Sequence, residues 1–143
     1  MNDEMDVGYS LVFMDLDNMK KLNDTYGHET VNKILKKIGK VISDGIRSGD
    51  AAGRYGGDEF ILILPETDTA GAEAVVTRIM NRIKETDWKS VDERLDGFEG
   101  PTLSAGIAES SNKNYIPYED LIKNADNALY RSKRNGKNQS TVF

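Results

Sequence analysis

The sequence predicts an α+β fold, a palm or ferredoxin-like sandwich in which helices cover one face of a mainly antiparallel sheet. Three observations predict it. Strand-like and helix-like segments alternate along the chain, starting with a continuously apolar run at residues 9–16. The helix-like segments carry apolar residues at steps of three and four. A pair of glycines at 56–57 joins two strand-like segments through a tight turn, and strands joined in this way pair antiparallel.

The first third of the chain contains one predicted strand and two predicted helices. Tyr9 to Leu16 predicts a buried strand. Residues 18–26 predict a short helix that ends at Gly27. Thr30 to Arg47 predicts a long amphipathic helix that ends at Ser48-Gly49. The apolar positions of this long helix are Val31, Ile34, Leu35, Ile38, Val41, Ile42 and Ile46.

The rest of the chain begins with the predicted hairpin. Residues 51–55 and 60–64 form its two strands, and Pro65 ends the second strand. The other predicted elements are, in order, a helix from Thr69 to Lys84, a variable loop or weak hairpin at residues 86–100, a strand from Thr102 to Glu109, a helix from Pro117 to Arg134 and an edge strand from Ser140 to Phe143. Trp88, in the polar segment, indicates nothing by itself.

The composition predicts a single globular domain. A chain of 143 residues with 38% apolar and 30% charged residues buries roughly 70% of the surface that its unfolded form exposes. We expect residues 9–143 to form this domain, after a short tail at residues 1–8. With no cysteine, no signal pattern and no membrane-spanning run, the chain is expected to be cytoplasmic and not bound to a membrane. A net charge of −5 argues against duplex nucleic acid as a partner.

Acidic residues stand where two of the predicted strands meet a turn. Asp15 and Asp17 close the first apolar run, and Asp58 and Glu59 follow Gly56-Gly57 in the hairpin. If the two strands are neighbours, these carboxylates converge. Carboxylates with no histidine or cysteine beside them make a hard-oxygen site, suited to Mg²⁺ or Mn²⁺ shared with phosphates. The sequence therefore predicts a divalent metal site at this edge of the sheet.

From Tyr9 to its end the chain resembles the GGDEF domain of diguanylate cyclases. Six blocks in the family's order and spacing make the resemblance specific, whereas two glycines followed by two acids would be a weak signal alone. The matching residues are Asp15-Leu16-Asp17, then Lys20, Asn23-Asp24 and Gly27-His28, Arg54-Tyr55-Gly56-Gly57-Asp58-Glu59-Phe60, Leu64-Pro65, Ser104-Ala105-Gly106-Ile107-Ala108, and Ala125-Asp126-Asn127-Ala128-Leu129-Tyr130 through Lys133 to Gly136-Lys137-Asn138.

The resemblance implies a metal-dependent nucleotidyl cyclase. In that family two facing domains each hold one nucleoside triphosphate, and the two nucleotides are joined into a cyclic dinucleotide with release of pyrophosphate. By resemblance Asp15, the Leu16 carbonyl, Asp58 and Glu59 bind Mg²⁺ or Mn²⁺, and Asp58 also lies near the attacking ribose hydroxyl. Asp15, Asp58 and Glu59 are then the catalytic residues. The implied substrate is GTP, the product is c-di-GMP, and turnover needs a homodimer.

The resemblance also assigns nucleotide contacts in three parts of the chain. They are Gly56 and Gly57 against the nucleotide, the amides of Asn18, Met19 and Lys20 on phosphate at a helix start, Asn23 on the base, and Lys133 and Lys137 on the terminal phosphate. Each residue also has a plain structural interpretation. The glycines make a tight turn, and Asp15 or Asp17 caps a helix. The single histidine, His28, is expected to be structural.

One departure from the family concerns the base. Where the family usually has Gly-Asp, this chain has Val31-Asn32, and that aspartate reads guanine together with the counterpart of Asn23. A carboxylate accepts from both guanine donors, whereas the Asn32 amide offers one acceptor and one donor group, which complement adenine instead. An adenine-containing product, made from ATP, is therefore an alternative to c-di-GMP.

A second departure is the short stretch before Tyr9. Family domains usually begin with a helix well before the first strand, attached to a sensor. The chain is therefore either a trimmed piece or a compact enzyme, similar to the minimal palm polymerases of the CRISPR-associated branch, that dimerises by itself.

A regulatory signature is also present. Arg47-Ser48-Gly49-Asp50 matches the family's inhibitory RxxD site, and Arg78 falls where a second arginine contact is expected. The plain alternative is a surface ion pair at a helix end. A product site built for c-di-GMP favours guanine over adenine. It also leaves open a regulatory domain that binds a nucleotide or c-di-GMP without turnover.

Overall fold

The computed structural model describes residues 8–143, and the predicted tail lies outside this range except for Gly8. The elements are β1 (Gly8–Leu16), α1 (Met19–Tyr26), α2 (His28–Gly45), β2 (Ala51–Arg54), β3 (Glu59–Pro65), α3 (Thr69–Lys84), α4 (Trp88–Val91), the 3₁₀ turn η1 (Glu93–Leu95), β4 (Leu103–Ser111), α5 (Tyr118–Arg134) and β5 (Ser140–Val142). Within residues 8–143, no helix has the length and apolar character needed to cross a membrane.

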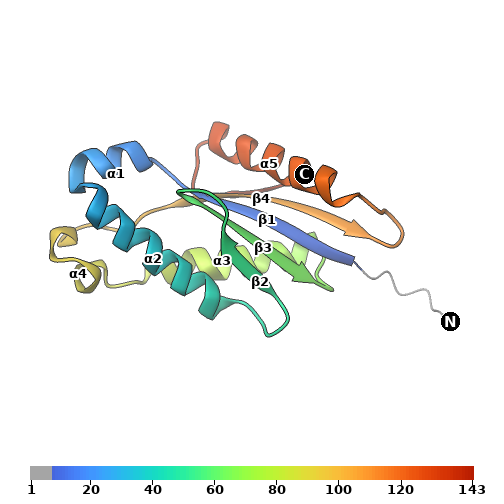
Figure 1. Ribbon diagram of the computed structural model, residues 1–143, viewed down its shortest axis with the longest axis horizontal. Helices are drawn as coiled ribbons and strands as arrows, with labels where there is room; N and C mark the ends of the chain where they lie inside the picture. The colour runs from blue at the N-terminus through green and yellow to red at the C-terminus, as the bar shows by residue number, and fades with distance from the viewer. Residues whose placement is uncertain (1–7) are drawn as a thin grey trace.

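The strands form one sheet with the order β2-β3-β1-β4-β5 (Figure 1). β1 lies at its centre and pairs antiparallel with β3 on one side and with β4 on the other. β2 and β3 make the predicted hairpin. β5 adds a parallel edge beside β4, after α5 has carried the chain back along the sheet. The predicted mixed fold with a mainly antiparallel sheet is confirmed.

Helices cover both faces of the sheet, so the expectation of one covered face is wrong (Figure 1). Val12 and Met14 face a core that also contains buried side chains of α2 and α3. Leu11 and Phe13, which alternate with them along β1, pack with buried residues of α5 on the opposite face. A strand that is apolar at every position has two faces to bury, and one layer of helices covers only one of them.

Gly106 of β4 brings α5 unusually close to the sheet. A Cβ atom at this position would lie 2.1 Å from the carbonyl oxygen of Ala125 and 2.2 Å from the backbone nitrogen of Leu129. Both atoms belong to the backbone of α5, so no side-chain rotation relieves the clash. The missing side chain at Gly106 therefore sets the distance between helix and strand.

The segment at residues 86–100 is neither an open loop nor a hairpin. It forms α4 and η1, and Trp88 is buried with only 3% of its surface exposed. The Trp88 indole nitrogen donates a hydrogen bond to the Ile83 carbonyl at the end of α3, 3.1 Å away. Trp88 therefore belongs to the core, which corrects the view that it carries no information. A large aromatic ring in a polar segment supplies its own apolar area for folding back onto a core.

The register of the sheet positions the predicted acidic site. Asp15 stands opposite Glu59 in the β1–β3 pair. The backbone nitrogen of Leu16 donates to the carbonyl oxygen of Asp58 at 3.1 Å. The C-terminal end of α5 also reaches this end of the sheet, where Lys133 contacts the Leu16 carbonyl. One end of β1 thus gathers groups from three segments that are far apart in sequence.

Candidate functional site

A pocket of about 550 Å³ opens at the end of β1 where the acidic residues meet. Its wall combines carboxylates, the start of a short helix and two lysines. It is lined by Asp15, Leu16, Asn18, Met19, Lys20, Lys21, Asp24, Asp58, Lys133 and Lys137. The structure therefore places in one pocket most of the residues that the sequence assigned to metal and phosphate. Glu59 stands beside it, opposite Asp15 in the sheet.

The Lys133 ammonium lies among oxygen atoms of the end of β1. It is 3.3 Å from Oδ2 of Asp15, 3.2 Å from the Leu16 carbonyl oxygen and 2.8 Å from Oδ1 of Asp17. Asp15 and the Leu16 carbonyl, two of the predicted metal ligands, thus share one positive charge. Within residues 8–143, no three acidic or histidine side chains form a ready-made metal cluster.

The chemistry of the donor atoms fits a hard divalent cation. The pKa of Asp15 is raised to about 7, mainly by burial and also by the neighbouring Asp58, while Lys133 acts to lower it. Burial and the charge of Asp58 likewise raise the pKa of Glu59. Oδ1 of Asp15 is buried and has no hydrogen-bond partner among the described residues. Crowded carboxylates that share too little positive charge are the groups a divalent cation stabilises.

Asp17 has a larger structural role than the sequence indicated. Its side chain is fully buried and accepts hydrogen bonds from Thr102 Oγ1 and Ser104 Oγ, both at 2.7 Å. It also accepts from Lys133 Nζ at 2.8 Å and from the backbone nitrogen of Asn138 at 3.0 Å. Burial raises the pKa of Asp17, but these hydrogen bonds outweigh it and the net pKa is lowered.

The helix-cap interpretation of Asp15 and Asp17 is wrong. The residue at the N-cap of α1 is Asn18, in a left-handed conformation with φ 58°, and no side chain caps the first amides of this helix. Asn18 Oδ1 instead accepts a hydrogen bond of 2.7 Å from Nζ of Lys137. The start of α1, with Met19 and Lys20 in the pocket wall, therefore offers amides and a lysine to an anion.

The predicted base-reading and turn residues lie apart from the pocket wall. Gly56 and Gly57 form the exposed turn between β2 and β3. Asn32 is exposed on α2, next to Val31, which is buried in the core. Asn23 on α1 has a buried Oδ1 without a hydrogen-bond partner among residues 8–143. None of the four lines the phosphate-side pocket.

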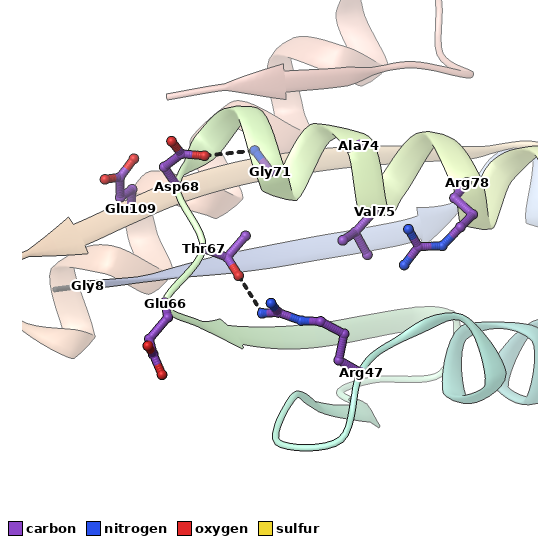
Figure 2. Close-up of a pocket in the computed structure, with 10 residues that line it drawn as sticks. All are labelled: Gly8, Arg47, Glu66, Thr67, Asp68, Gly71, Ala74, Val75, Arg78 and Glu109. Atoms are coloured by element: carbon purple, nitrogen blue, oxygen red, sulfur yellow. Dashed lines mark hydrogen bonds between the residues drawn. The ribbon is translucent and has the colours of Figure 1, made fainter.

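A second pocket, of about 580 Å³, lies at the other end of β1 and contains both predicted inhibitory arginines (Figure 2). Arg47, just after α2, and Arg78, on α3, line it from two sides. The Arg47 guanidinium donates to Thr67 Oγ1 at 2.8 Å and to the Pro65 carbonyl at 3.0 Å. The Arg78 guanidinium donates to the Gly45 carbonyl at 2.6 Å. The guanidinium groups of Arg47 and Arg78 therefore line the same pocket.

Asp50 pairs with Arg47 but does not line this pocket. Its side chain is 2% exposed, against 60% for Arg47. Its carboxylate accepts a 2.9 Å hydrogen bond from the Arg47 backbone nitrogen and contacts the Arg47 guanidinium. Asp50 therefore orients Arg47 and does not itself line the hollow. The acidic neighbours Glu66, Asp68 and Glu109 complete much of the wall.

Comparison with known proteins identifies relatives over most of the chain. The profile of the family described as diguanylate cyclase, GGDEF domain, matches residues 3–139. Diguanylate cyclase DosC of Escherichia coli K12 is 38% identical over 134 residues, which cover 94% of this chain and 28% of DosC. Diguanylate cyclase A of Treponema denticola is 37% identical over 137 residues, 93% of this chain and 34% of that protein. The chain thus spans about a third or less of these relatives.

Solved structures show the same fold. The active GGEEF domain of a diguanylate cyclase from Vibrio cholerae superposes with a TM-score of 0.83 at 29% identity, covering 95% of this chain and 83% of that one. The GGDEF domain of DgcB from Caulobacter crescentus, crystallised in complex with c-di-GMP, gives a TM-score of 0.79 at 26% identity, with 95% and 78% covered.

The raised pKa of Asp15 predicts a pH-dependent stability of the metal-free protein. Below about pH 4 the carboxyl is protonated in the folded and unfolded chains alike. Between there and its folded pKa of about 7, the unfolded chain loses the proton first, so stability is lost as pH rises. In chelator, Asp15→Asn should therefore gain stability relative to wild type from pH 4 to pH 8, by on the order of 1–2 kcal/mol.

Urea unfolding across this pH range measures the difference. Asp44→Asn is the matched control, because the exposed ion pair between Asp44 and Lys40 contributes little to stability. A constant difference between Asp15→Asn and wild type at all pH values contradicts the description of Asp15.

Proposed function

The chain belongs to the GGDEF domain family of diguanylate cyclases, and on that basis we propose that it is a metal-dependent nucleotidyl cyclase. It joins two molecules of GTP into c-di-GMP and releases pyrophosphate. The observation that carries the proposal is the pocket at the end of β1, where Asp15 and Asp58 face Lys133 and Lys137. Acid groups for a cation and lysines for phosphates on one wall are the parts that phosphoryl transfer needs. GTP as substrate agrees with the predicted cytoplasmic location.

Asp15, the Leu16 carbonyl, Asp58 and Glu59 are the proposed ligands of Mg²⁺ or Mn²⁺. When bound, the cation lowers the pKa of the attacking ribose hydroxyl and neutralises charge on the leaving pyrophosphate. The unpartnered Oδ1 of Asp15 is available to it without breaking a hydrogen bond. With a cation on Asp15, the Lys133 ammonium, now 3.3 Å from Oδ2 of Asp15, would be less tied to this carboxylate and available to a terminal phosphate.

The reaction forms a bond between a ribose hydroxyl oxygen of one nucleotide and the α phosphorus of the other, and breaks the α–β phosphate linkage. Asp58 is proposed to lie nearest the attacking hydroxyl. The start of α1 and the side chains of Lys133 and Lys137 hold the phosphates, with Asn18, Met19 and Lys20 supplying amides. Gly56 and Gly57 let the turn approach the nucleotide. Because the two reacting nucleotides occupy equivalent sites, turnover needs a homodimer.

The first test identifies the product. The protein is incubated with Mg²⁺ or Mn²⁺ and equimolar ATP and GTP, and cyclic dinucleotides are identified by mass spectrometry. We expect c-di-GMP, and a loss of about 100-fold or more in rate for Asp58→Ala and Glu59→Ala, because each removes charge stabilisation from the transition state. Glu73→Gln, exposed on α3, is the matched control. No cyclic product at high protein concentration favours the rival function, a regulatory domain that binds nucleotide without turnover.

A specific observation keeps an adenine-containing product as the second candidate. The proposed base contacts are two amides, Asn23 and Asn32, where a carboxylate would accept from both guanine donors. Oδ1 of Asn23 is an unused acceptor in the described chain. Asn32 is exposed and free to turn either end of its amide to a base.

The variant Asn32→Asp tests this base contact. A carboxylate at this position should raise the ratio of GTP to ATP used, measured as kcat/KM for each, by about tenfold or more, because it satisfies a guanine donor that the amide opposes. Asn81→Asp adds the same charge at an exposed site on α3 and should leave the ratio unchanged. An unchanged ratio in Asn32→Asp sinks the assignment of Asn32 to the base.

We also propose that the pocket between Arg47 and Arg78 binds the cyclic product, with Asp50 orienting Arg47. The support is the pair of guanidinium groups on one hollow. Such groups form paired hydrogen bonds with phosphates and with guanine edges. The acidic wall residues Glu66, Asp68 and Glu109 confine the anionic phosphates to the arginine side.

Isothermal titration with c-di-GMP measures this site. Arg47→Ala and Arg78→Ala should each weaken binding by about tenfold, the loss of one charge-assisted contact. Arg82→Ala is the matched control, because Arg82 lies one turn along α3 and donates a similar bond to the Asp44 carbonyl, yet does not line the pocket. Equal affinity in Arg47→Ala and wild type contradicts the product site.

A further inference from the structure

Asp17 is a buried charge with no part in the proposed ligand set. Its side chain is fully buried, whereas Asp15, two residues earlier, is 20% exposed. A buried carboxylate is costly unless its oxygens are paired. The groups that donate hydrogen bonds to the Asp17 oxygens therefore show which segments Asp17 holds in place.

Each carboxylate oxygen of Asp17 accepts one hydrogen bond from the sheet side and one from the segment that carries the lysines. Oδ1 accepts from Ser104 Oγ at 2.7 Å and from Lys133 Nζ at 2.8 Å. Oδ2 accepts from Thr102 Oγ1 at 2.7 Å and from the Asn138 backbone nitrogen at 3.0 Å. Thr102 and Ser104 lie at the start of β4 and so fix the carboxylate from the sheet side. Lys133 and Asn138 are then fixed by the carboxylate.

The turn after α5 needs such an anchor. Lys137 and Asn138 both have positive φ values, 65° and 51°, a conformation that costs free energy for residues other than glycine. The Asn138 amide bound to Asp17 and the Lys137 amide bound to the Ser132 carbonyl at 2.9 Å hold the turn in this shape. In this shape the Lys137 side chain reaches Asn18 in the pocket wall.

We propose that Asp17 is the positioning residue for recognition of a terminal phosphate. It sets Lys133 through a direct ion pair and Lys137 through the turn that precedes Asn138. Of the three contacts of the Lys133 ammonium, the one to Asp17 is the shortest. It is also the one contact whose acceptor is not among the proposed metal ligands, so it would remain if Asp15 and the Leu16 carbonyl bound a cation. This inference rests on the proposed function, because it takes the two lysines as contacts of a nucleoside triphosphate.

The chemistry requires a carboxylate at position 17. All four partners of Asp17 donate hydrogen bonds, and asparagine has one acceptor oxygen and one donor group. In Asp17→Asn, one pair of donors therefore faces another donor, and either Lys133 or Asn138 loses its anchor. The expected defect is selective. It should appear for ligands with a third phosphate and be small for ligands without it.

The experiment compares two ligands that differ only in that phosphate. Titration calorimetry with Mg²⁺ measures the affinities of the full chain for α,β-methylene GTP and α,β-methylene GDP, and for the adenine pair, none of which can release pyrophosphate. Wild type should favour the triphosphate by about tenfold, and Asp17→Asn should bring this ratio close to one. Lys133→Met should lower the ratio as well. The double variant should lower it no further than Asp17→Asn alone, because Lys133 is one of the two lysines through which Asp17 is proposed to act.

The control is Ser132→Ala, next to Lys133 on α5. Ser132 is buried and its hydroxyl bonds the Ala105 carbonyl and Thr141, but it does not touch Asp17. It should lose stability and keep the wild-type ratio, which separates positioning from general loosening of the fold. If Asp17→Asn does not fold, Thr102→Val decides the question. It keeps the carboxylate, removes one anchor and should lower the ratio about threefold.

The outcomes separate the two proposals. A wild-type ratio in Asp17→Asn, or in Thr102→Val when that variant decides the question, overturns the role of Asp17 and leaves the cyclase proposal intact. Wild type that binds both ligands of a pair equally overturns the role of the lysines, and with it this inference. Wild type that binds no nucleotide of either pair overturns the proposed function itself.

Discussion

The pairing of β1 with β3 is the constraint on which the site depends. Their register puts Asp15 opposite Glu59, and burial of β1 on both faces fixes that register, because a shift of one residue would exchange the two sets of core side chains. Leu11 and Val12, which point to opposite faces, are both fully buried. The apolar packing of the strand thereby holds two acidic side chains together against their mutual repulsion.

The two aspartates at the end of β1 show how environment separates identical groups. Asp15 has a raised pKa because burial and Asp58 act on a carboxylate that has only Lys133 to balance them. Asp17 is more buried, yet its pKa is lowered because four donors surround it. The first carboxylate is open to further positive charge, and the second has its partners already. Lys133 contacts both carboxylates. The charge of Asp15 therefore affects how Lys133 is placed against Asp17.

Local patterns in the sequence predicted the strands, the long helices and the hairpin well, because periodicity and turn residues depend on neighbours along the chain. They also predicted that the acidic residues converge at one end of β1. The contacts of Asp17 could not be predicted from the sequence, because Thr102 and Ser104 come close to it only when β4 pairs with β1. The second helical layer was missed although the unbroken apolar run of β1 contained the signal. Trp88 was missed because its core contacts come from Ile83 and from a segment of polar composition. The proposed roles of Asn23 and Asn32 depend on a bound base, which no pattern of apolar residues encodes.

The close approach at Gly106 constrains how α5 packs on the sheet. The backbones of β4 and α5 approach so closely at Gly106 that one added carbon atom would clash with main-chain atoms of α5. Lys133, near the C-terminal end of α5, therefore projects from a helix that packs close to the sheet, and we expect any adjustment of its ammonium group to come from its own methylene groups. If Lys133 contacts a phosphate as proposed, the length of its side chain sets how far from the helix that phosphate can lie.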